Sequence, residues 1–426
     1  MQTEDSLVTL NQWWTSGAIP EMLARRYRRS VFPEVSRLFT SHRQILLLTG
    51  LRRVGKSTIV YQLISDLLKE EDPRSLLYYT FDAGAADIVA ILDAYTKVTG
   101  SDWRNEKLFL FLDEIQKLGG WSDQLKMLYD SFANLRVVVS GSASLRLHKE
   151  ALDNLAGRHF SLDVPPLSIV EFYELKHGKT VDRAELYASR IGSELDRYLR
   201  RPFPEIVGWE EERDVREYVR EQVVSKVVRG DIQDTFSKAN HALLEGLLSV
   251  FYSRPGMILS VDSLAREFRV SKTTLENHLF FLEFSMLIRL VRNFRPSRMS
   301  ESRKLKKVYP YCVALALSFN NLEKGLVYES AVADLLNAKN YWRAGGKEVD
   351  FILREPLRAV EVKSGERIDS HDLDGVTRFV KKFAAEGVVV YAGPAGEVGR
   401  IALVPLTDFL IRPYDVTPMR DAARPC

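Results

Sequence analysis

Two short stretches of the sequence carry residue types that could act on phosphate groups. The first is GLRRVGKS at residues 50–57, which has the spacing GxxxxGK[ST]. The second is EVDFILREPLRAVEVKSG at 348–365, in which Asp350 precedes Glu361 and Lys363. A glycine-rich loop can cradle a triphosphate, and two carboxylates with a lysine can hold a metal ion beside a phosphodiester. The strands and helices around each stretch determine which of these reactions its residues can carry out.

The stretch at 50–57 lies between an expected strand, QILLLT, and an expected helix, IVYQLISDLL, as a phosphate loop requires. Two glycines let the backbone N–H groups turn inward, and the helix N-terminus adds partial positive charge. We expect Lys56 to reach the β- and γ-phosphates of ATP and Ser57 to bind Mg²⁺. The predicted ATP-binding residues are Gly50, Leu51, Arg52, Arg53, Val54, Gly55, Lys56, Ser57, Thr58 and Ser140.

Polar residues also end two later apolar strands of this region. The strand LFLFLD ends at Asp113, which is expected to bind Mg²⁺, and the following Glu114 is expected to activate the attacking water. Ser140 ends the strand LRVVVS and is expected beside Asp113 across neighbouring strand ends, where it either senses the γ-phosphate or is simply the residue at which the chain leaves the strand. Arg52 and Arg53 either contact nucleotide or are solvated. These residues predict ATP hydrolysis.

Arg158 lies in the segment LAGRHFSLDV, which follows these strands. Our hypothesis is that Arg158 acts as an arginine finger, reaching the nucleotide of a neighbouring subunit. A homo-oligomer follows as a prediction, and a hexameric ring is one form that it could take.

The segment SVDSLAREFRVSKTTLENHLFFLE at 260–283 predicts a helix-turn-helix. Leucines at helical spacing would pack both helices inward, and Ser271 is a good N-cap for the second. Residues 292–307, RNFRPSRMSESRKLKK, would form a basic wing on the DNA backbone. Packing of the module against protein, with a solvated basic loop, is the alternative. The predicted DNA-binding residues are Lys272, Thr273, Arg292, Arg295, Arg298, Arg303, Lys304, Lys306 and Lys307.

The stretch at 348–365 predicts two strands joined by a tight turn at 355–356, with Asp350 opposite residue 361 or 362. Glu361 and Lys363 are two residues apart, so they share one face of the second strand. Glu329, on the expected helix LVYESAVADLL, is a fourth candidate. Asp350 and Glu361 would bind Mg²⁺ or Mn²⁺, and Lys363 would add positive charge at the scissile phosphate. A solvated hairpin and a site kept only for binding remain alternatives.

Composition limits the class of protein. The chain has 426 residues, 46% hydrophobic and 27% charged, which is a globular balance with room for several domains. No run of about 18 apolar residues occurs, and the first residues carry acids where a secretory signal needs bases. Two distant cysteines give no disulfide framework. We therefore expect a cytoplasmic protein without a membrane partner.

Four apolar runs between 44 and 142 alternate with helical patterns, which predicts a parallel sheet in an α/β domain. GLRRVGKST, FLFLDEIQ, VVVSGSAS and AGRHFSLDVPPLSIVEFYEL together resemble the prokaryotic AAA+ ATPases that carry a winged helix and a restriction-endonuclease-like C-terminal domain. The resemblance covers roughly 20–410. It implies that Glu329, Asp350, Glu361 and Lys363 match the PD-(D/E)xK nuclease pattern.

The expected domains follow from these patterns. They are an N-terminal helical segment at 1–40, an AAA+ P-loop ATPase core at 41–185, a helical lid at 186–250, a winged helix-turn-helix at 251–319 and a nuclease-like α/β domain at 320–426. The favoured function is an ATP-dependent, DNA-binding nuclease whose ATPase regulates metal-dependent cleavage of duplex or branched DNA. The alternative is an ATP-driven regulatory switch whose nuclease-like domain binds DNA or protein without catalysis.

Overall fold

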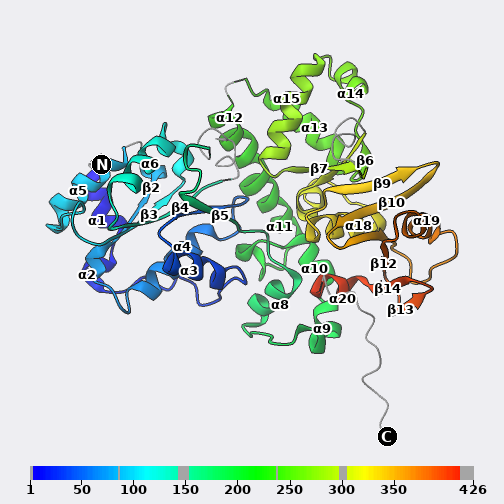
Figure 1. Cartoon of the computed structure of the whole chain (residues 1–426), viewed down its shortest axis with the longest axis horizontal. Coiled ribbons are helices and arrows are strands. Elements are labelled where there is room, and N and C mark those ends of the chain that lie inside the picture. Colours follow the sequence, from blue (N-terminus) through cyan, green and yellow to red (C-terminus); the bar gives the residue numbers. More distant parts are fainter. Residues whose placement is uncertain (1–2, 85–86, 143–152, 237, 297–304, 413–426) are drawn as a thin grey trace, which may run out of the picture. The chain divides into compact units, whose positions relative to one another are not determined.

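A computed structural model describes residues 3–84, 87–142, 153–236, 238–296 and 305–412 (Figure 1). The chain forms two compact units, each built from two stretches of sequence. The first unit comprises Met1–Pro166 and Gly230–Ser237, and the second comprises Leu167–Arg229 and Lys238–Cys426. A short segment after Arg229 therefore belongs to the first unit, although the sequence on both sides of it belongs to the second.

The first unit is built on a five-stranded sheet in the order β2-β3-β4-β1-β5. Every pair of neighbours in this sheet is parallel, and the apolar strands β1 to β4 are buried along nearly their whole length. The four strands predicted from apolar runs are confirmed. The strands are β1 (Ile45–Thr49), β2 (Leu76–Thr80), β3 (Leu108–Asp113), β4 (Leu135–Ser140) and β5 (His159–Asp163).

Helices cover both faces of this sheet. Side chains of α1, α5 and α6 pack with one face in a common apolar core. On the other face Phe39 of α3 stacks on two phenylalanines of β3, and α4 lies against β4. The helices are α1 (Thr3–Leu10), α2 (Trp13–Ser16), α3 (Phe32–Ser41), α4 (Lys56–Leu67), α5 (Ile88–Thr99), α6 (Trp121–Ser131) and α12 (Ile232–Thr235), with short 3-10 turns at Pro73–Ser75, Phe81–Ala83 and Ile115–Lys117.

The second unit begins with helices, and the described residues between 186 and 250 contain no strand. The segments Val219–Ser225 and Val227–Asp231 are π-helical. The helices are α8 (Ile169–His177), α9 (Ala188–Gly192), α10 (Leu195–Arg200), α11 (Glu212–Tyr218), α13 (His241–Ser253), α14 (Val261–Glu267), α15 (Lys272–Phe284), α17 (Val313–Leu317), α18 (Lys324–Leu335), α19 (Asp374–Phe383) and α20 (Leu406–Ile411), with 3-10 turns at Ala184–Tyr187 and Pro204–Ile206.

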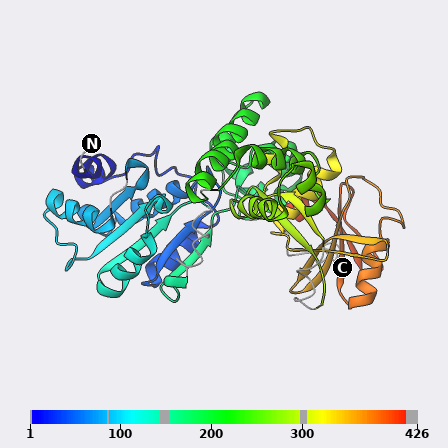
Figure 2. The ribbon, with the colours of Figure 1, turned by 90° about the horizontal axis from the view of Figure 1, so that it is seen from above.

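A nine-stranded mixed sheet forms the core of the second unit, in the order β13-β14-β12-β11-β10-β9-β7-β8-β6. The helix α19, orange in Figure 2, packs on β10, β11 and β12. The strands are β6 (Met257–Ile258), β7 (Ile288–Asn293), β8 (Lys306–Pro310), β9 (Asn340–Ala344), β10 (Lys347–Arg354), β11 (Leu357–Val362), β12 (Glu386–Tyr391), β13 (Gly396–Val398) and β14 (Ile401–Pro405).

One sheet thus spans the expected boundary at residue 320. The strands β6, β7 and β8 come from the segment predicted to be a winged helix, and β9 onward come from the predicted nuclease-like domain. Parallel pairing of β7 with β9, at Arg292 with Asn340 and Asn293 with Tyr341, joins the two sets. Residues of the expected wing can therefore reach the carboxylates of the C-terminal sheet.

None of the helices in the described ranges has the length and apolar character that crossing a membrane demands.

Candidate functional site

The phosphate loop joins β1 to α4 with the backbone geometry that its glycines allow. Gly50 has φ +153°, and a Cβ there would lie 2.4 Å from the backbone oxygen of Val164. Gly55 has φ +96° and caps α4, and Arg53 between them has φ +68°. Both glycines therefore hold positions where a side chain would clash or strain the backbone, as the motif predicted.

Lys56 lies inside the loop. Its ammonium donates hydrogen bonds to the carbonyl oxygens of Gly50 (2.9 Å) and Leu51 (2.8 Å). Burial lowers the pKa of Lys56, while the nearby Glu114 and Asp113 carboxylates act in the opposite direction. A buried ammonium in this loop is suited to bind phosphate. A phosphate oxygen carries negative charge, so it would be a stronger partner for Lys56 than the two carbonyl oxygens.

Asp113, at the end of β3, is the centre of a hydrogen-bond network. Its carboxylate accepts bonds from the hydroxyls of Ser57 (2.6 Å), Tyr78 (3.0 Å) and Ser140, and from the backbone N–H of Glu114 (3.1 Å). The predicted magnesium residues Ser57 and Asp113 are thus brought together, and their oxygens fit the preference of Mg²⁺ for hard ligands.

Ser140 lies beside Asp113, as expected from the neighbouring ends of β3 and β4, and its hydroxyl donates a hydrogen bond to the Asp113 carboxylate. Tyr78 of β2 has no place in the motif, and sequence reasoning missed it. Its hydroxyl reaches Asp113 because β2 and β3 are neighbours, with Thr80 beside Asp113.

Glu114 follows Asp113 and has a left-handed backbone, with φ +54°. A non-glycine residue in that region is uncommon and is concentrated at functional sites. The side-chain amide of Gln116 donates a hydrogen bond to its carboxylate. Burial raises the pKa of Glu114, and the Lys56 ammonium partly offsets this effect. A carboxylate with a raised pKa beside a phosphate loop is suited to accept a proton from water.

The arginines expected at the nucleotide have other partners in this structure. Arg158, the hypothetical finger, forms an ion pair with Asp130 of the same unit at 2.8 Å. Arg52 is bonded through two nitrogens to Asp231, and Arg53 is exposed. Asp231 was not predicted, because nothing in the sequence links it to a loop almost two hundred residues away.

The predicted hairpin at 348–365 is confirmed as β10 and β11, which pair antiparallel with Phe351 opposite Val360. Asp350 and Glu361 adjoin Phe351 and Val360 along these strands, and the Asp350 carboxylate accepts the backbone N–H of Val362 at 2.9 Å. The expected order of helix, hairpin, helix and strand is present in α18, β10, β11, α19 and β12.

Lys307 is the main departure from expectation in the second unit. It was predicted to contact DNA from an exposed wing, but its side chain is only 6% exposed. Its ammonium lies 2.6 Å from a carboxylate oxygen of Glu348, 3.3 Å from Glu329 and 3.5 Å from Asp350. Although burial disfavours its charge, Tyr309 and the three carboxylates raise the pKa of Lys307. The wing prediction is wrong for this residue because β8 is an inner strand of the sheet.

Glu361 and Lys363 form an ion pair at 3.0 Å, and Lys363 also lies 3.5 Å from Asp372. Glu361 is buried, so the alternative of a solvated hairpin is wrong for it. One of its carboxylate oxygens, Oε2, has no hydrogen-bond partner. Within the described ranges, no set of three or more histidine, cysteine, aspartate or glutamate side chains is arranged to hold a metal ion. The Lys307 ammonium lies among the carboxylates of Glu329, Glu348 and Asp350, at the position that a bound metal ion would need.

The buried carboxyl groups of Glu329 and Glu361 predict that the stability of the folded chain depends on pH. Burial and the nearby Asp350 raise the pKa of Glu361 to about 8, and burial raises that of Glu329 to about 7. The folded state therefore holds protons that the unfolded chain releases above about pH 4.3, so this contribution is lost as pH rises through 7 to 8. We expect a lower thermal midpoint at pH 9 than at pH 6, and a smaller difference for Glu361→Gln. An equal difference in both proteins would contradict the assignment.

Two helices, α14 and α15, occupy the segment predicted to be a helix-turn-helix. The hydroxyl of Ser271 accepts the N–H of Thr274 at 3.0 Å, which confirms the predicted N-cap. Lys272 and Thr273 are exposed, and Lys272 forms an ion pair with Asp262. Of the wing residues, Arg292 is exposed and Arg295 and Lys306 are half-buried. The predicted contacts Arg298, Arg303 and Lys304 lie outside the described residues.

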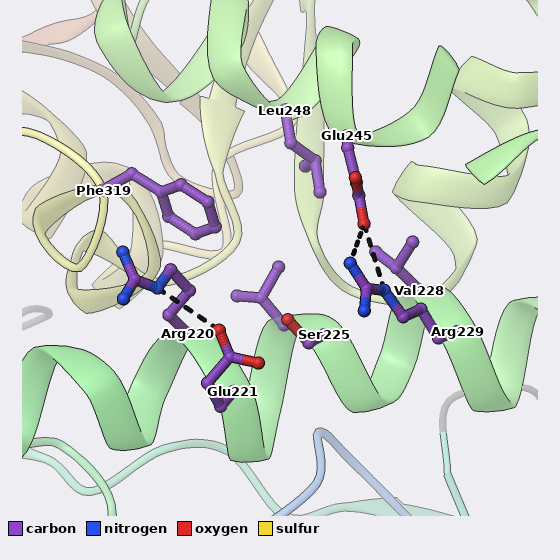
Figure 3. A pocket seen from close by; sticks show the side chains of 9 residues that line it. Arg220, Glu221, Ser225, Val228, Arg229, Glu245, Leu248 and Phe319 are labelled. Carbon is purple, nitrogen blue, oxygen red and sulfur yellow. Dashed lines mark hydrogen bonds and ion pairs between the residues drawn. The ribbon is translucent and has the colours of Figure 1, made fainter. Parts of the chain in front are cut away.

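A pocket of about 200 Å³ lies between the π-helical stretch and α13 in the second unit (Figure 3). Apolar side chains of Val228, Leu248 and Phe319 line it. The charged side chains on its walls are paired, with Arg229 bonded to Glu245 and Arg220 to Glu221. No motif marked this pocket in the sequence.

Comparison with known proteins gives the first unit a class. Residues 42–173 match the family described as AAA domain. Residues 194–325 and 324–409 match two families that are each described as a domain of unknown function, DUF8612 and DUF4143. Together with the parallel sheet and its loop, the first match identifies residues 42–173 as a P-loop ATPase domain of the AAA class.

Whole-chain relatives carry no stated activity. The uncharacterized protein MJ1637 of Methanocaldococcus jannaschii is 25% identical over 415 residues, which cover 87% of this chain and 85% of that protein. The uncharacterized protein MJ1544 of the same organism is 26% identical over 330 residues, which cover 73% of this chain and 72% of that protein. The Walker-type ATPase PABY2304 of Pyrococcus abyssi is 14% identical and has a TM-score of 0.43, over 70% of this chain and 97% of that one.

Proposed function

We propose that this chain is an ATP-driven regulatory switch, in which the first unit binds and hydrolyses ATP and the second binds a partner. The observation that carries the proposal is the meeting of Lys56, Ser57 and Asp113 at the end of a parallel sheet. The Ser57 hydroxyl lies 2.6 Å from Asp113, and the Lys56 ammonium is held inside the loop. These groups supply what binding of a magnesium nucleotide requires.

Each residue at this edge of the sheet has a role in hydrolysis. Lys56 and the loop N–H groups bind the phosphates, and Ser57 and Asp113 would hold Mg²⁺, which offsets the charge on the transferred phosphoryl group. Glu114 takes the proton of the attacking water. Tyr78 and Ser140 donate hydrogen bonds to Asp113 and so keep its carboxylate oriented. Arg158 as a finger in a ring of subunits stays a prediction.

The contacts of Lys307 favour a binding role for the carboxylates of the second unit, in preference to catalysis of cleavage. A metal-dependent nuclease needs Asp350 and Glu361 free to bind a divalent cation. Here Asp350 instead faces the Lys307 ammonium at 3.5 Å, and that ammonium also contacts two further carboxylates. The Lys307 ammonium therefore supplies, beside these carboxylates, the positive charge that a metal ion would otherwise supply. DNA remains the proposed partner, through the exposed start of α15 and the basic residues that follow β7.

One set of assays tests this proposal. The wild-type chain is expected to hydrolyse ATP and to bind duplex or four-way-junction DNA, without cleaving either DNA in Mg²⁺ or Mn²⁺. Lys56→Ala is expected to lose ATP binding, because the loop then lacks its buried cation. Wild-type cleavage that disappears in Glu361→Ala would overturn the switch and favour the metal-dependent nuclease. Failure of the wild type to hydrolyse ATP would overturn the ATPase assignment.

A further inference from the structure

The phosphate loop is tied to a distant part of the chain by one ion pair. The Arg52 guanidinium donates from Nε to both carboxylate oxygens of Asp231, at 3.1 and 3.0 Å, and from a terminal nitrogen at 2.5 Å. The Asp231 side chain is 5% exposed and that of Arg52 is 26% exposed. Two-pronged pairing of this kind fixes both groups more firmly than a single contact does.

Asp231 lies where the sequence passes between the two units. Gly230–Ser237 belongs to the first unit, whereas Arg229 and the residues before it belong to the second. Asp231 is the last residue of the π-helical stretch that begins at Val227, and α12 follows it directly. A residue held by the phosphate loop is therefore covalently continuous with the helix that lines the pocket of the second unit.

Arg52 lies within the electrostatic reach of the ATPase residues. Its charge acts on Lys56, and the carboxylates of Asp231, Glu114 and Asp82 act on Arg52. A guanidinium pairs with phosphate in the same two-pronged geometry as with a carboxylate. A nucleotide in this loop would bring several negative charges close to Arg52, so phosphate and Asp231 would compete for one guanidinium.

On the basis of the proposed ATPase, we propose that Asp231 is the residue through which the second unit senses nucleotide. The terminal phosphate of ATP draws Arg52 away from Asp231, and the released carboxylate loosens α12 and the helix before it. π-Helical turns occur mostly as short interruptions of α-helices, and these interruptions are frequent at functional sites. The two stretches Val219–Ser225 and Val227–Asp231 therefore mark a helix that is suited to rearrange when one end is released.

Removal of the competing carboxylate tests the exchange. We expect Asp231→Asn to bind a non-hydrolysable ATP analogue about 5- to 150-fold more tightly than the wild type, the usual range for coupled sites. In the Arg52→Gln background the same substitution is expected to change affinity little, because the competition needs the guanidinium. Asp234→Asn is the matched control, since Asp234 is exposed on α12. Isothermal titration calorimetry on the full chain measures each affinity.

Hydrogen exchange provides a second readout that needs no variant. In the wild type, amides of residues 219–235 are expected to exchange faster with the ATP analogue than without it, while those of β3 do not. Equal ATP affinity in Asp231→Asn and Asp234→Asn, or unchanged exchange at 219–235 on nucleotide binding, would overturn the sensing role and leave the ATPase standing. Absence of nucleotide binding by the wild type would overturn both.

Discussion

Replacing Glu114 by glutamine is expected to lower kcat for ATP hydrolysis by about 10²- to 10⁴-fold, the usual contribution of a general base. The amide keeps the size of the side chain and its place beside Gln116, but it cannot accept the proton of the attacking water. ATP binding is expected to survive, because the groups that would hold phosphate and Mg²⁺ are Lys56, Ser57 and Asp113. The effect should therefore appear in kcat with little change in KM.

Steady-state hydrolysis and equilibrium binding of ATP measure the two effects separately. Glu106→Gln is the matched control, since Glu106 is an exposed glutamate just before β3 and is expected to leave both quantities unchanged. A Glu114→Gln protein that turns over ATP at the wild-type rate would show that another group receives the proton. Loss of ATP binding in that protein would instead mean that Glu114 stabilises the loop.

The sequence predicts the ATPase site well because its residues are local to the sheet. In a parallel sheet the strands end at one edge, so residues after β1 and at the end of β3 come together whatever the helices do. The apolar runs define those strands, and the spacing GxxxxGKS defines the loop. Tyr78 was missed because it lies within a strand, where an aromatic residue is indistinguishable from core in the sequence.

Long-range pairing is what the sequence does not reveal. Asp231 was invisible because its partner Arg52 is contributed by a distant segment, and neither residue stands in a pattern that specifies the other. Lys307 was misassigned for a related reason. A dense run of basic residues is typical of an exposed wing. In the structure β7 pairs with both β8 and β9, so β8 is part of a nine-stranded sheet. Burial, which decides the role of Lys307, depends on that sheet.

Replacing Lys307 by methionine is expected to destabilise the second unit by about 3–5 kcal/mol, the usual cost of removing one partner from a buried ion pair. Methionine fills a similar volume, so loss of charge dominates over loss of packing. The carboxylates of Glu329, Glu348 and Asp350 would then face one another without the ammonium that now contacts all three. Thermal or urea denaturation of the full chain, followed in the transition of the second unit, measures the change.

The same variant distinguishes an internal cation from a merely buried lysine. If Lys307 takes the place of a metal ion, Mn²⁺ or Mg²⁺ is expected to raise the unfolding midpoint of Lys307→Met, because a divalent cation can bind the carboxylates that have lost the ammonium. The wild type should show little response, since its ammonium already lies among them.

Lys306→Met, one residue earlier on β8, is the control and is expected to be close to wild type in both stability and metal response. A Lys307→Met protein with wild-type stability would contradict the counter-ion role. A destabilised variant without a metal response would show that these carboxylates need the lysine itself, which would favour binding over metal-dependent cleavage.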